Sequence, residues 1–405
     1  MTTPAAPTPV HVDERARSMR RAMVAALRDA GELTDAAVTE ALAAEPRHLY
    51  VPVFYRRCRD DAGGGWFTER VDAGHPSWLP EVHADQALVT MLRDGTDGPP
   101  LSSSTAPSLM AAMLQSLAIE AGMNVLEVGT GTGYNAGLLA RLAGDAHVTT
   151  IDIEPAIIDT ARAALAAAGH PAVRVLCGDG ADLRGEPGSV DRIIATCGLT
   201  TVPDGWRVLV RPGGRIVAPI GAGIAAIDVD GESGASGRFL PTGAYFMGLR
   251  SAVGAAGVPF PGEPDDAPTG RCAMPLAAWA DNDFRFPVSL ALPDLMSRGG
   301  PDDPELVAWH GDGSIARIRA DGAAQQAGPR RLADALGALW IDFQAAGRPP
   351  RDRYGVTISP EGRHTAWRDT PDTAHSWQLG TPQQAMTNLF SLNWLEFVGQ
   401  GVGNP

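Results

Sequence analysis

The sequence has 405 residues, of which 44% are hydrophobic and 20% charged, as in a globular protein with a sizeable core. Its formal net charge is −14, and all 33 basic residues are arginine because the chain contains no lysine. An acidic chain without a basic run argues against a large nucleic-acid-binding surface, which needs clustered cations. The four cysteines have neither metal-ligand spacing nor the density of a disulfide framework, so we expect no metal site.

The first hundred residues are expected to form a tail, a helical cap and an irregular insert. Residues 1–12 form a Pro/Ala/Thr-rich tail, and apolar periodicity over residues 13–44 predicts two helices. Residues 46–52 begin and end with proline, which predicts a short extended segment. The Gly/Pro/Asp-rich stretch 60–100 predicts irregular structure with short strands. Since the chain shows no signal peptide and no apolar run of membrane-spanning length, we expect a cytoplasmic protein without a membrane partner.

Strands and helices alternate further along the chain. A helix is predicted over residues 106–121, and later helices lie between strands. The predicted strands cover residues 124–128, 147–152, 173–177, 190–196 and 214–219. This alternation predicts a parallel sheet covered on both faces, which is an α/β, Rossmann-like fold. We therefore expect an N-terminal part over residues 1–100, a core over 101–248 and a C-terminal α+β domain over 249–405.

A glycine-rich loop follows the first predicted strand of the core. The run VLEV at 125–128 leads directly into GTGTG at 129–133. Glycines let the backbone turn tightly and approach a ligand closely at the start of a helix. The anionic Glu127 would repel a pyrophosphate but suits a ligand that carries an ammonium and a sulfonium. The loop therefore favours S-adenosyl-L-methionine over a dinucleotide.

Acidic residues follow the next two predicted strands. Asp152 ends the second strand, about 20 residues beyond the loop, where a carboxylate can accept hydrogen bonds from ribose hydroxyls. Asp179 stands between two glycines after the third strand and could reach the adenine amino group. The predicted cofactor-binding residues are Glu127, Gly129, Thr130, Gly131, Thr132, Gly133, Asp152, Ile153, Gly178, Asp179, Gly180 and Thr196.

Together these motifs resemble the protein L-isoaspartyl (D-aspartyl) O-methyltransferase family over about residues 34–221. The resemblance rests on AEPRHLYVP at 44–52, VLEVGTGTGYNAGLLA at 125–140, GDG at 178–180, DRII at 191–194 and PGGRIVAPIG at 212–221. It implies a methyltransferase that uses S-adenosyl-L-methionine to esterify a carboxylate of a protein or peptide.

The family's substrate signature, Thr-Ile-Ser-x-Pro, has a counterpart in SSSTAP at residues 102–107. Ser103 takes the place of the threonine and Thr105 that of the serine, so the resemblance implies that these hydroxyls are catalytic and hold the substrate carboxylate. Ser102, Ser104 and His48 are assigned to substrate binding by the same resemblance. A Ser/Thr run before a helix is also typical of an N-cap, and His48 could equally be a structural histidine.

The chain is nearly twice as long as expected for the isoaspartate repair enzyme of this family. The extra length comes from a Gly-rich insert near 60–80 and from the part after 250. This layout resembles homologues that accompany ribosomally made peptides such as lanthipeptides and graspetides. The resemblance implies that an aspartate of a modified precursor peptide is methylated and that its ester closes to an aspartimide (succinimide). The alternatives are a general isoaspartate repair enzyme and a non-catalytic binding module. The identity of the peptide and the oligomeric state stay open.

Overall fold

The computed structural model describes residues 9–59, 66–93, 95, 98–232, 234–250, 258–300 and 303–380. The chain divides into two compact units. Among the described residues, the first runs to Gly180 and adds Val190–Ile194, and the second takes Ala181–Ser189 and residues 195–380. Within the described ranges, none of the helices is both long enough and apolar enough to cross a membrane.

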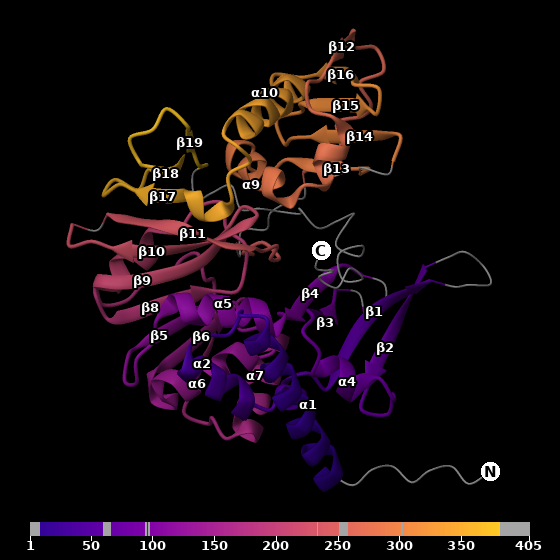
Figure 1. Ribbon diagram of the computed structural model, residues 1–405. Helices are drawn as coiled ribbons and strands as arrows, with labels where there is room; N and C mark the ends of the chain where they lie inside the picture. Colours follow the sequence, from indigo (N-terminus) through magenta and orange to yellow (C-terminus); the bar gives the residue numbers. More distant parts are fainter. Residues whose placement is uncertain are drawn as a thin grey trace, which may run out of the picture. The chain divides into compact units, whose positions relative to one another are not determined.

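The first unit contains strands in the order β8-β5-β6-β7, of which β5, β6 and β7 are parallel. Helix α6 packs against β5 and β6, and α7 packs against β6 and β7 (Figure 1). The bounds are β5 Val125–Val128, α6 Tyr134–Ala143, β6 Val148–Asp152, α7 Pro155–Ala168, β7 Arg174–Cys177 and β8 Val190–Ala195. Strands alternating with covering helices make a Rossmann-like α/β core, which confirms the predicted fold class.

Helices α1, α2 and α5 form a helical layer in which α1 packs on α2, and α2 packs on α5 and α6. Their bounds are α1 Pro9–Asp29, α2 Ala36–Ala44 and α5 Pro107–Leu117. Helix α1 thus begins inside the expected tail, whose residues 1–8 lie outside the described part. Asp35 caps α2 by accepting a hydrogen bond from the amide of Val38 at 2.9 Å.

The prediction of an extended segment at residues 46–52 is wrong, because Arg47–Tyr50 form the single helical turn α3. Pro46 caps this turn and Pro52 follows it, so neither proline removes a hydrogen bond from inside the helix. Val51 leaves the helical conformation directly before Pro52, as a residue preceding proline must. Prolines at both ends of a segment are therefore compatible with a helical turn as well as with a strand.

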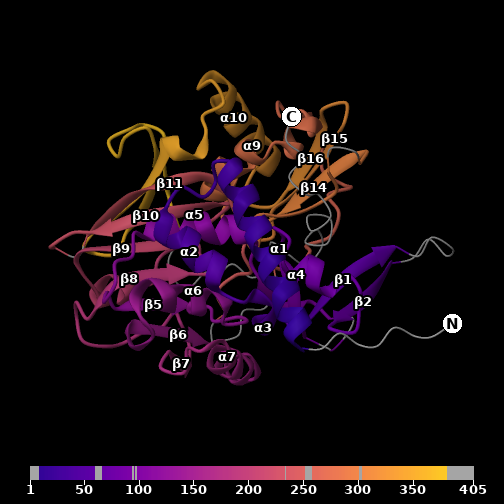
Figure 2. The same cartoon turned by 60° about the horizontal axis from the view of Figure 1, so that its bottom comes forward.

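The segment expected to be an irregular insert forms a four-stranded antiparallel sheet in the order β2-β1-β3-β4. The bounds are β1 Val53–Arg59, β2 Trp66–Asp72, α4 Trp78–Val82, β3 Leu88–Leu92 and β4 Pro100–Ser104. Figure 2 shows β1 and β2 as a long ribbon. On β4, Ser103 pairs with Val89 of β3, so the predicted substrate signature lies on a strand.

The second unit contains two antiparallel sheets, with strand orders β19-β18-β17-β11-β10-β9 and β12-β16-β15-β14-β13. The bounds are α8 Asp204–Leu209, β9 Val210–Ile220, β10 Gly223–Val229, β11 Ala235–Gly243, β12 Thr269–Arg271, α9 Asn282–Ala291, β13 Met296–Arg298, β14 Glu305–Trp309, β15 Ile315–Arg319, β16 Ala323–Ala327, α10 Leu332–Ala345, β17 Tyr354–Ile358, β18 His364–Arg368 and β19 Ser376–Gln378.

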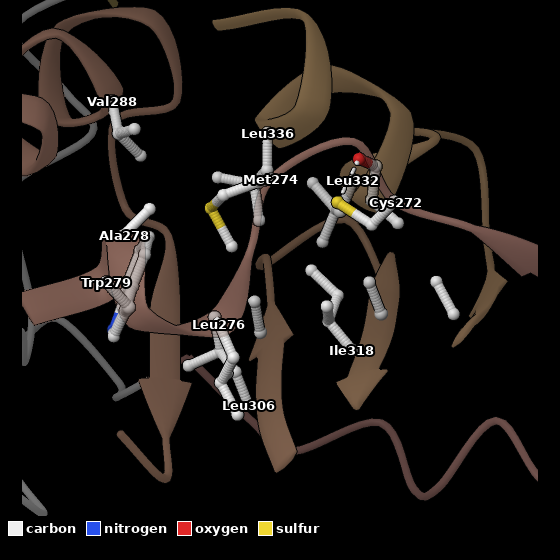
Figure 3. Close-up of a cluster of buried hydrophobic side chains, with 14 of the residues drawn as sticks. Cys272, Met274, Leu276, Ala278, Trp279, Val288, Leu306, Ile318, Leu332 and Leu336 are labelled. Carbon is white, nitrogen blue, oxygen red and sulfur yellow. Dashed lines mark hydrogen bonds between the residues drawn. The ribbon is translucent and has the colours of Figure 1, made fainter. Parts of the chain in front are cut away.

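Helices α9 and α10 pack on each other, and α10 covers β15 and β16. Between these elements lies a hydrophobic core of its own, which includes Met274, Leu306, Ile318 and Leu336, each fully buried (Figure 3). The part of the second unit from Thr269 to Ala345 therefore has its own sheet, helices and core, as an α+β arrangement requires.

Candidate active site

The loop between β5 and α6 depends on its three glycines. Gly129, Gly131 and Gly133 have φ values of +97°, +51° and +85°, in the left-handed region that favours glycine. The amide of Gly133 donates to the carbonyl of Thr130 at 2.9 Å, and Gly133 caps α6. The loop is thus a tight turn that leads the backbone to a helix start, the geometry used to approach a ligand closely.

Glu127 lies on β5, fully buried, at the centre of a hydrogen-bond network. Its Oε1 accepts from Nδ2 of Asn135 at 2.7 Å, and its Oε2 accepts from Oγ1 of Thr150 at 2.6 Å. The hydroxyls of Thr130 and Thr150 are 2.7 Å apart, and since the proton of Thr150 points to Glu127, Thr130 donates to Thr150. Burial raises the pKa of Glu127 to about 7, although the two donors oppose the rise. The network ties the loop to β5, β6 and α6.

Asp152 ends β6 and contacts the glycine loop directly. Its Oδ2 accepts from the amide of Gly131, and its Oδ1 accepts from the amide of Glu154, both at 3.2 Å. Asp179 follows β7 and is half-buried. Because β5, β6 and β7 are parallel neighbours, their carboxyl ends lie at one edge of the sheet, which is where ligands bind in open α/β sheets. The loop and both acids thus share that edge.

Most of the remaining predicted cofactor-binding residues lie close to this edge. Thr132 accepts a hydrogen bond at Oγ1 from the amide of Tyr134 at 3.3 Å and so supports the start of α6. Ile153 follows Asp152 and is half-buried, while Gly178 and Gly180 flank Asp179. Thr196 follows β8 and belongs to the second unit, where it is half-buried.

Along β4 and just beyond it, hydroxyl side chains alternate between buried and half-buried positions, as the period of a strand requires. Ser102 and Ser104 are buried: Ser102 Oγ accepts from Oγ1 of Thr90, and Ser104 Oγ accepts from Nε of Arg47, both at 3.2 Å. Ser103 and Thr105 are half-buried, and their hydroxyls form no hydrogen bond among the described residues. Ser102 and Ser104 therefore hold the strand in place, whereas the hydroxyls of Ser103 and Thr105 are available to bind a ligand.

The segment of residues 102–105, called here the serine strand, comes close to the glycine loop. A Cβ added to Gly131 would lie 3.4 Å from the carbonyl oxygen of Ser103 and 3.6 Å from Oγ of Ser102. The two segments are almost thirty positions apart in the sequence, but they lie so close that one added carbon at Gly131 would reach van der Waals contact with Ser103. The residues predicted for the substrate and those predicted for the cofactor are thus neighbours.

Arg47, to which sequence reasoning assigned no role, holds the serine strand in place. Its fully buried guanidinium donates to Ser104 Oγ and to the carbonyls of Ser104 and Thr105 at 3.1–3.2 Å. It also donates to the carbonyls of Val82, Ala84 and Gln86 at 3.0–3.1 Å. Burial lowers the pKa of Arg47 to about 10. Its place in the Pro-Arg-His motif was the signal, but the bonded carbonyls are visible only in the fold.

His48 lies beside α1 and α4, against His83 and Trp78, with ring centroids 5.5 and 6.4 Å away. One ring nitrogen, Nε2, lies 3.2 Å from Oδ1 of Asp13. Burial lowers the pKa of His48 and lowers that of His83 to about 3, so both rings are neutral at neutral pH. These contacts show His48 packing within the helical cap.

The glycine loop and acids define a class of protein: the S-adenosyl-L-methionine-dependent methyltransferases. A family model described as protein-L-isoaspartate(D-aspartate) O-methyltransferase matches residues 87–230. The chain is also 37% identical over 191 residues to protein-L-isoaspartate O-methyltransferase 1 of Anaeromyxobacter sp., which covers 47% of this chain and 74% of the relative. The chain belongs to the protein-L-isoaspartate O-methyltransferase family, whose members use S-adenosyl-L-methionine.

Other relatives match over a smaller share of their length. The enzyme of Thermotoga maritima is 35% identical over 143 residues, 35% of this chain and 44% of the relative. That of Nitrobacter winogradskyi is 37% identical over 115 residues, 28% of this chain and 52% of the relative. The chain thus spans about half the length of these curated relatives.

A solved structure entitled protein-L-isoaspartate O-methyltransferase has a similar fold. It matches with a TM-score of 0.51 and 19% identity, covering 87% of this chain and all of the other. Such coverage extends well past the core, so the additional C-terminal part has a counterpart in that fold.

Proposed function

We propose that this protein is an S-adenosyl-L-methionine-dependent O-methyltransferase that esterifies the free carboxylate of L-isoaspartyl residues in proteins or peptides. The observation that carries the proposal is the close approach of the glycine loop and the serine strand at Gly131 and Ser103, where a single added Cβ would bring the two into contact. It supports a donor and an acceptor carboxylate held side by side, and family membership supports the isoaspartyl carboxylate as acceptor.

The site suits the cofactor. The loop offers space that a side chain at Gly131 would take, and Asp152 has a carboxylate at the strand end where ribose hydroxyls are bound in such folds. Glu127 adds a buried negative charge behind the loop once it is ionised. Bound S-adenosyl-L-methionine supplies an electrophilic methyl group on a sulfonium.

The chain's own task is to place and desolvate the acceptor. A carboxylate with a pKa near 4 is ionised at neutral pH and is already a nucleophile, so the reaction needs no strong general base. The hydroxyls of Ser103 and Thr105 would donate to that carboxylate and align one of its oxygens. Arg47 would act as a positioning residue through the carbonyls of Ser104 and Thr105. A misplacement of about 1 Å can reduce such a rate roughly 100-fold.

The test is methyl-ester formation on a synthetic isoaspartyl peptide and on its aspartyl counterpart, followed by mass spectrometry. We expect esterification of the isoaspartyl peptide, and about 100-fold slower turnover in a Ser103→Ala/Thr105→Ala double variant with unchanged affinity for S-adenosylhomocysteine. Thr160→Ala is the matched control, because this exposed hydroxyl bonds only within α7. Full activity in the double variant would reject the role given to the strand.

A second candidate keeps the same chemistry but takes an aspartate of a ring-constrained, ribosomally made peptide. After esterification, the amide nitrogen of the following residue attacks the ester carbonyl, loses its proton and expels methanol, leaving an aspartimide. In this candidate the α+β part from Thr269 to Ala345, which has its own core, would supply the surface for a dedicated peptide. Methylation of a cyclised aspartyl peptide, without turnover of the linear isoaspartyl peptide, would select this second candidate.

A further inference from the structure

Tyr134 is the first residue of α6 and directly follows the glycine loop. Its amide donates to Oγ1 of Thr132 at 3.3 Å, so its backbone is bonded to the loop itself. Its side chain is buried, and its hydroxyl has no hydrogen-bond partner among the described residues. The contacts that fix this side chain are therefore made by the ring rather than by the hydroxyl.

Two residues of α3 converge on the ring of Tyr134. Arg47 and Tyr50 are three positions apart, which places them on the same face of that helical turn. The guanidinium of Arg47 lies over the Tyr134 ring at 5.7 Å from its centroid, and the Tyr50 ring meets it edge-on, with centroids 5.7 Å apart. The quadrupole of an aromatic ring attracts a cation over its face, most strongly when both are desolvated, as these two buried groups are.

The junction of α2 and α3 is itself anchored to α6. Tyr50 donates its hydroxyl proton to Oε1 of Glu45, and the fully buried Glu45 forms an ion pair with Arg141 of α6. Gly137 of α6 leaves room for this approach, because a Cβ added there would lie only 2.9 Å from Oε1 of Glu45. The chain that carries α3 is therefore held against α6, and the side chains that meet at the start of α6 are held with it.

The guanidinium that lies over Tyr134 also holds the serine strand. Arg47 donates to the carbonyls of Ser104 and Thr105, and to three carbonyls in the segment 82–86. A continuous series of contacts thus runs from the glycine loop through the Tyr134 ring and Arg47 to these two segments. Loss of the ring would keep the hydrogen bonds of the guanidinium but remove the contact that ties it to the start of α6.

We propose that Tyr134 is a positioning residue that couples occupancy of the glycine loop to the position of the serine strand through Arg47. A ligand that fixes the loop also fixes the start of α6, and with it the ring on which the guanidinium rests. Such coupling is a free energy shared by two sites, and it acts equally in both directions. Its use in catalysis rests on the proposed function: the hydroxyls of Ser103 and Thr105 would be aligned when the methyl donor is bound.

Hydrogen exchange measured by mass spectrometry on the full-length protein, with and without saturating S-adenosylhomocysteine, tests this coupling. The readout is the exchange rate of amides in the segment 82–86, which Arg47 holds by its carbonyls. The amides of His83, Ala84 and Gln86 in this segment donate hydrogen bonds, so their exchange reports on local opening. We expect S-adenosylhomocysteine to slow this exchange about 10-fold in wild type, since coupling between sites commonly amounts to about 5–150-fold.

Two substitutions of Tyr134 separate the ring from the rest of the side chain. Tyr134→Phe keeps the ring and removes only the unpartnered hydroxyl, so it should show the same slowing as wild type. Tyr134→Leu keeps an apolar side chain without a ring and should lose most of the slowing. Tyr134→Met, with an unbranched and adaptable side chain, takes its place if the leucine variant does not fold.

Phe260→Leu is the matched control, because it removes a ring from a comparable contact in the second unit. There the guanidinium of Arg298 lies 4.7 Å from the centroid of the Phe260 ring. This variant should keep the slowing of wild type, which would show that loss of a cation–π contact elsewhere has no such effect.

Three results would overturn the proposal. The first is an exchange rate in segment 82–86 of wild type that S-adenosylhomocysteine does not change. The second is full slowing in Tyr134→Leu or Tyr134→Met, because a mere loss of packing speeds exchange by the same factor with and without ligand. The third is loss of the slowing in Tyr134→Phe, which would assign the effect to the hydroxyl.

The measurement needs no methyl acceptor, so its outcome is separable from that of the proposed function. If the isoaspartyl peptide is not esterified while the slowing depends on the Tyr134 ring, the isoaspartyl activity fails and the coupling stands. If the peptide is esterified while Tyr134→Leu keeps the full slowing, the activity stands and the coupling fails.

Discussion

Replacing Glu127 by glutamine tests the electrostatics of the buried network behind the glycine loop. The substitution keeps the shape of the side chain and removes its charge. The glutamine carbonyl can still accept from Asn135, and its NH₂ group can donate to Thr150 once that hydroxyl turns toward Thr130. We therefore expect the variant to fold.

The expected effect on stability follows from the pKa of Glu127, which burial raises from 4.5 to about 7. Between these two pH values the folded state holds the proton more tightly than the unfolded state, so the free energy of unfolding falls as pH rises. The shift corresponds to a loss of about 3 kcal/mol, complete above pH 7 and absent below pH 4.5. Glu127→Gln has no such proton and escapes this loss.

Urea denaturation of the ligand-free wild type and variant from pH 4.5 to 8 measures the effect. The difference in unfolding free energy should move in favour of the variant by about 2–3 kcal/mol over this range. Glu40→Gln, at an exposed position of α2, is the matched control. A Glu127→Gln difference that stays constant with pH would refute the raised pKa and with it the view of Glu127 as a buried, reluctantly ionised group.

Three further substitutions probe how the site is held together. In Arg47→Lys, the ammonium group cannot reproduce the six hydrogen bonds of the planar guanidinium, so we expect more than about 3 kcal/mol of destabilisation and lower turnover. The control, Arg184→Lys at an exposed position, should change neither stability nor turnover. An unchanged urea midpoint in Arg47→Lys would contradict this prediction. Gly131→Ala strains a φ of +51° and meets the Ser103 carbonyl, so calorimetry with S-adenosylhomocysteine should show at least about 10-fold weaker binding; wild-type affinity would count against the loop. Thr150→Val removes one donor from Glu127 and should lower stability by about 1–3 kcal/mol in thermal unfolding at pH 8, with a smaller loss at pH 5, where Glu127 is protonated; a pH-independent loss would contradict the network.

The class of fold was predictable because its signals are local. The apolar pattern located β5, β6 and β7 to within one residue and placed helices between them. Glycines at positions of positive φ marked the loop, since only glycine adopts that backbone readily. The prolines around residues 47–50 misled, because they restrict their neighbours without deciding between a strand and a helical turn.

The site was predictable only as separate pieces. The order of motifs indicated a glycine loop, two acids at strand ends and a run of hydroxyls, but their contact depends on strand pairing between β3 and β4 and on the sheet edge. The alternation along β4, which separates Ser102 and Ser104 from Ser103 and Thr105, required knowing that this segment is a strand.

The sequence by itself thus determined the family, the cofactor and the α/β core, because glycine conformation, apolar periodicity and the order of motifs are properties of short stretches of chain. Tertiary structure alone decided that Arg47 binds six backbone and side-chain oxygens, that Glu127 is buried among donors, and that Gly131 lies close to Ser103. Burial and close approach between distant segments arise from packing, and packing sets the pKa values and the alignment on which the chemistry depends.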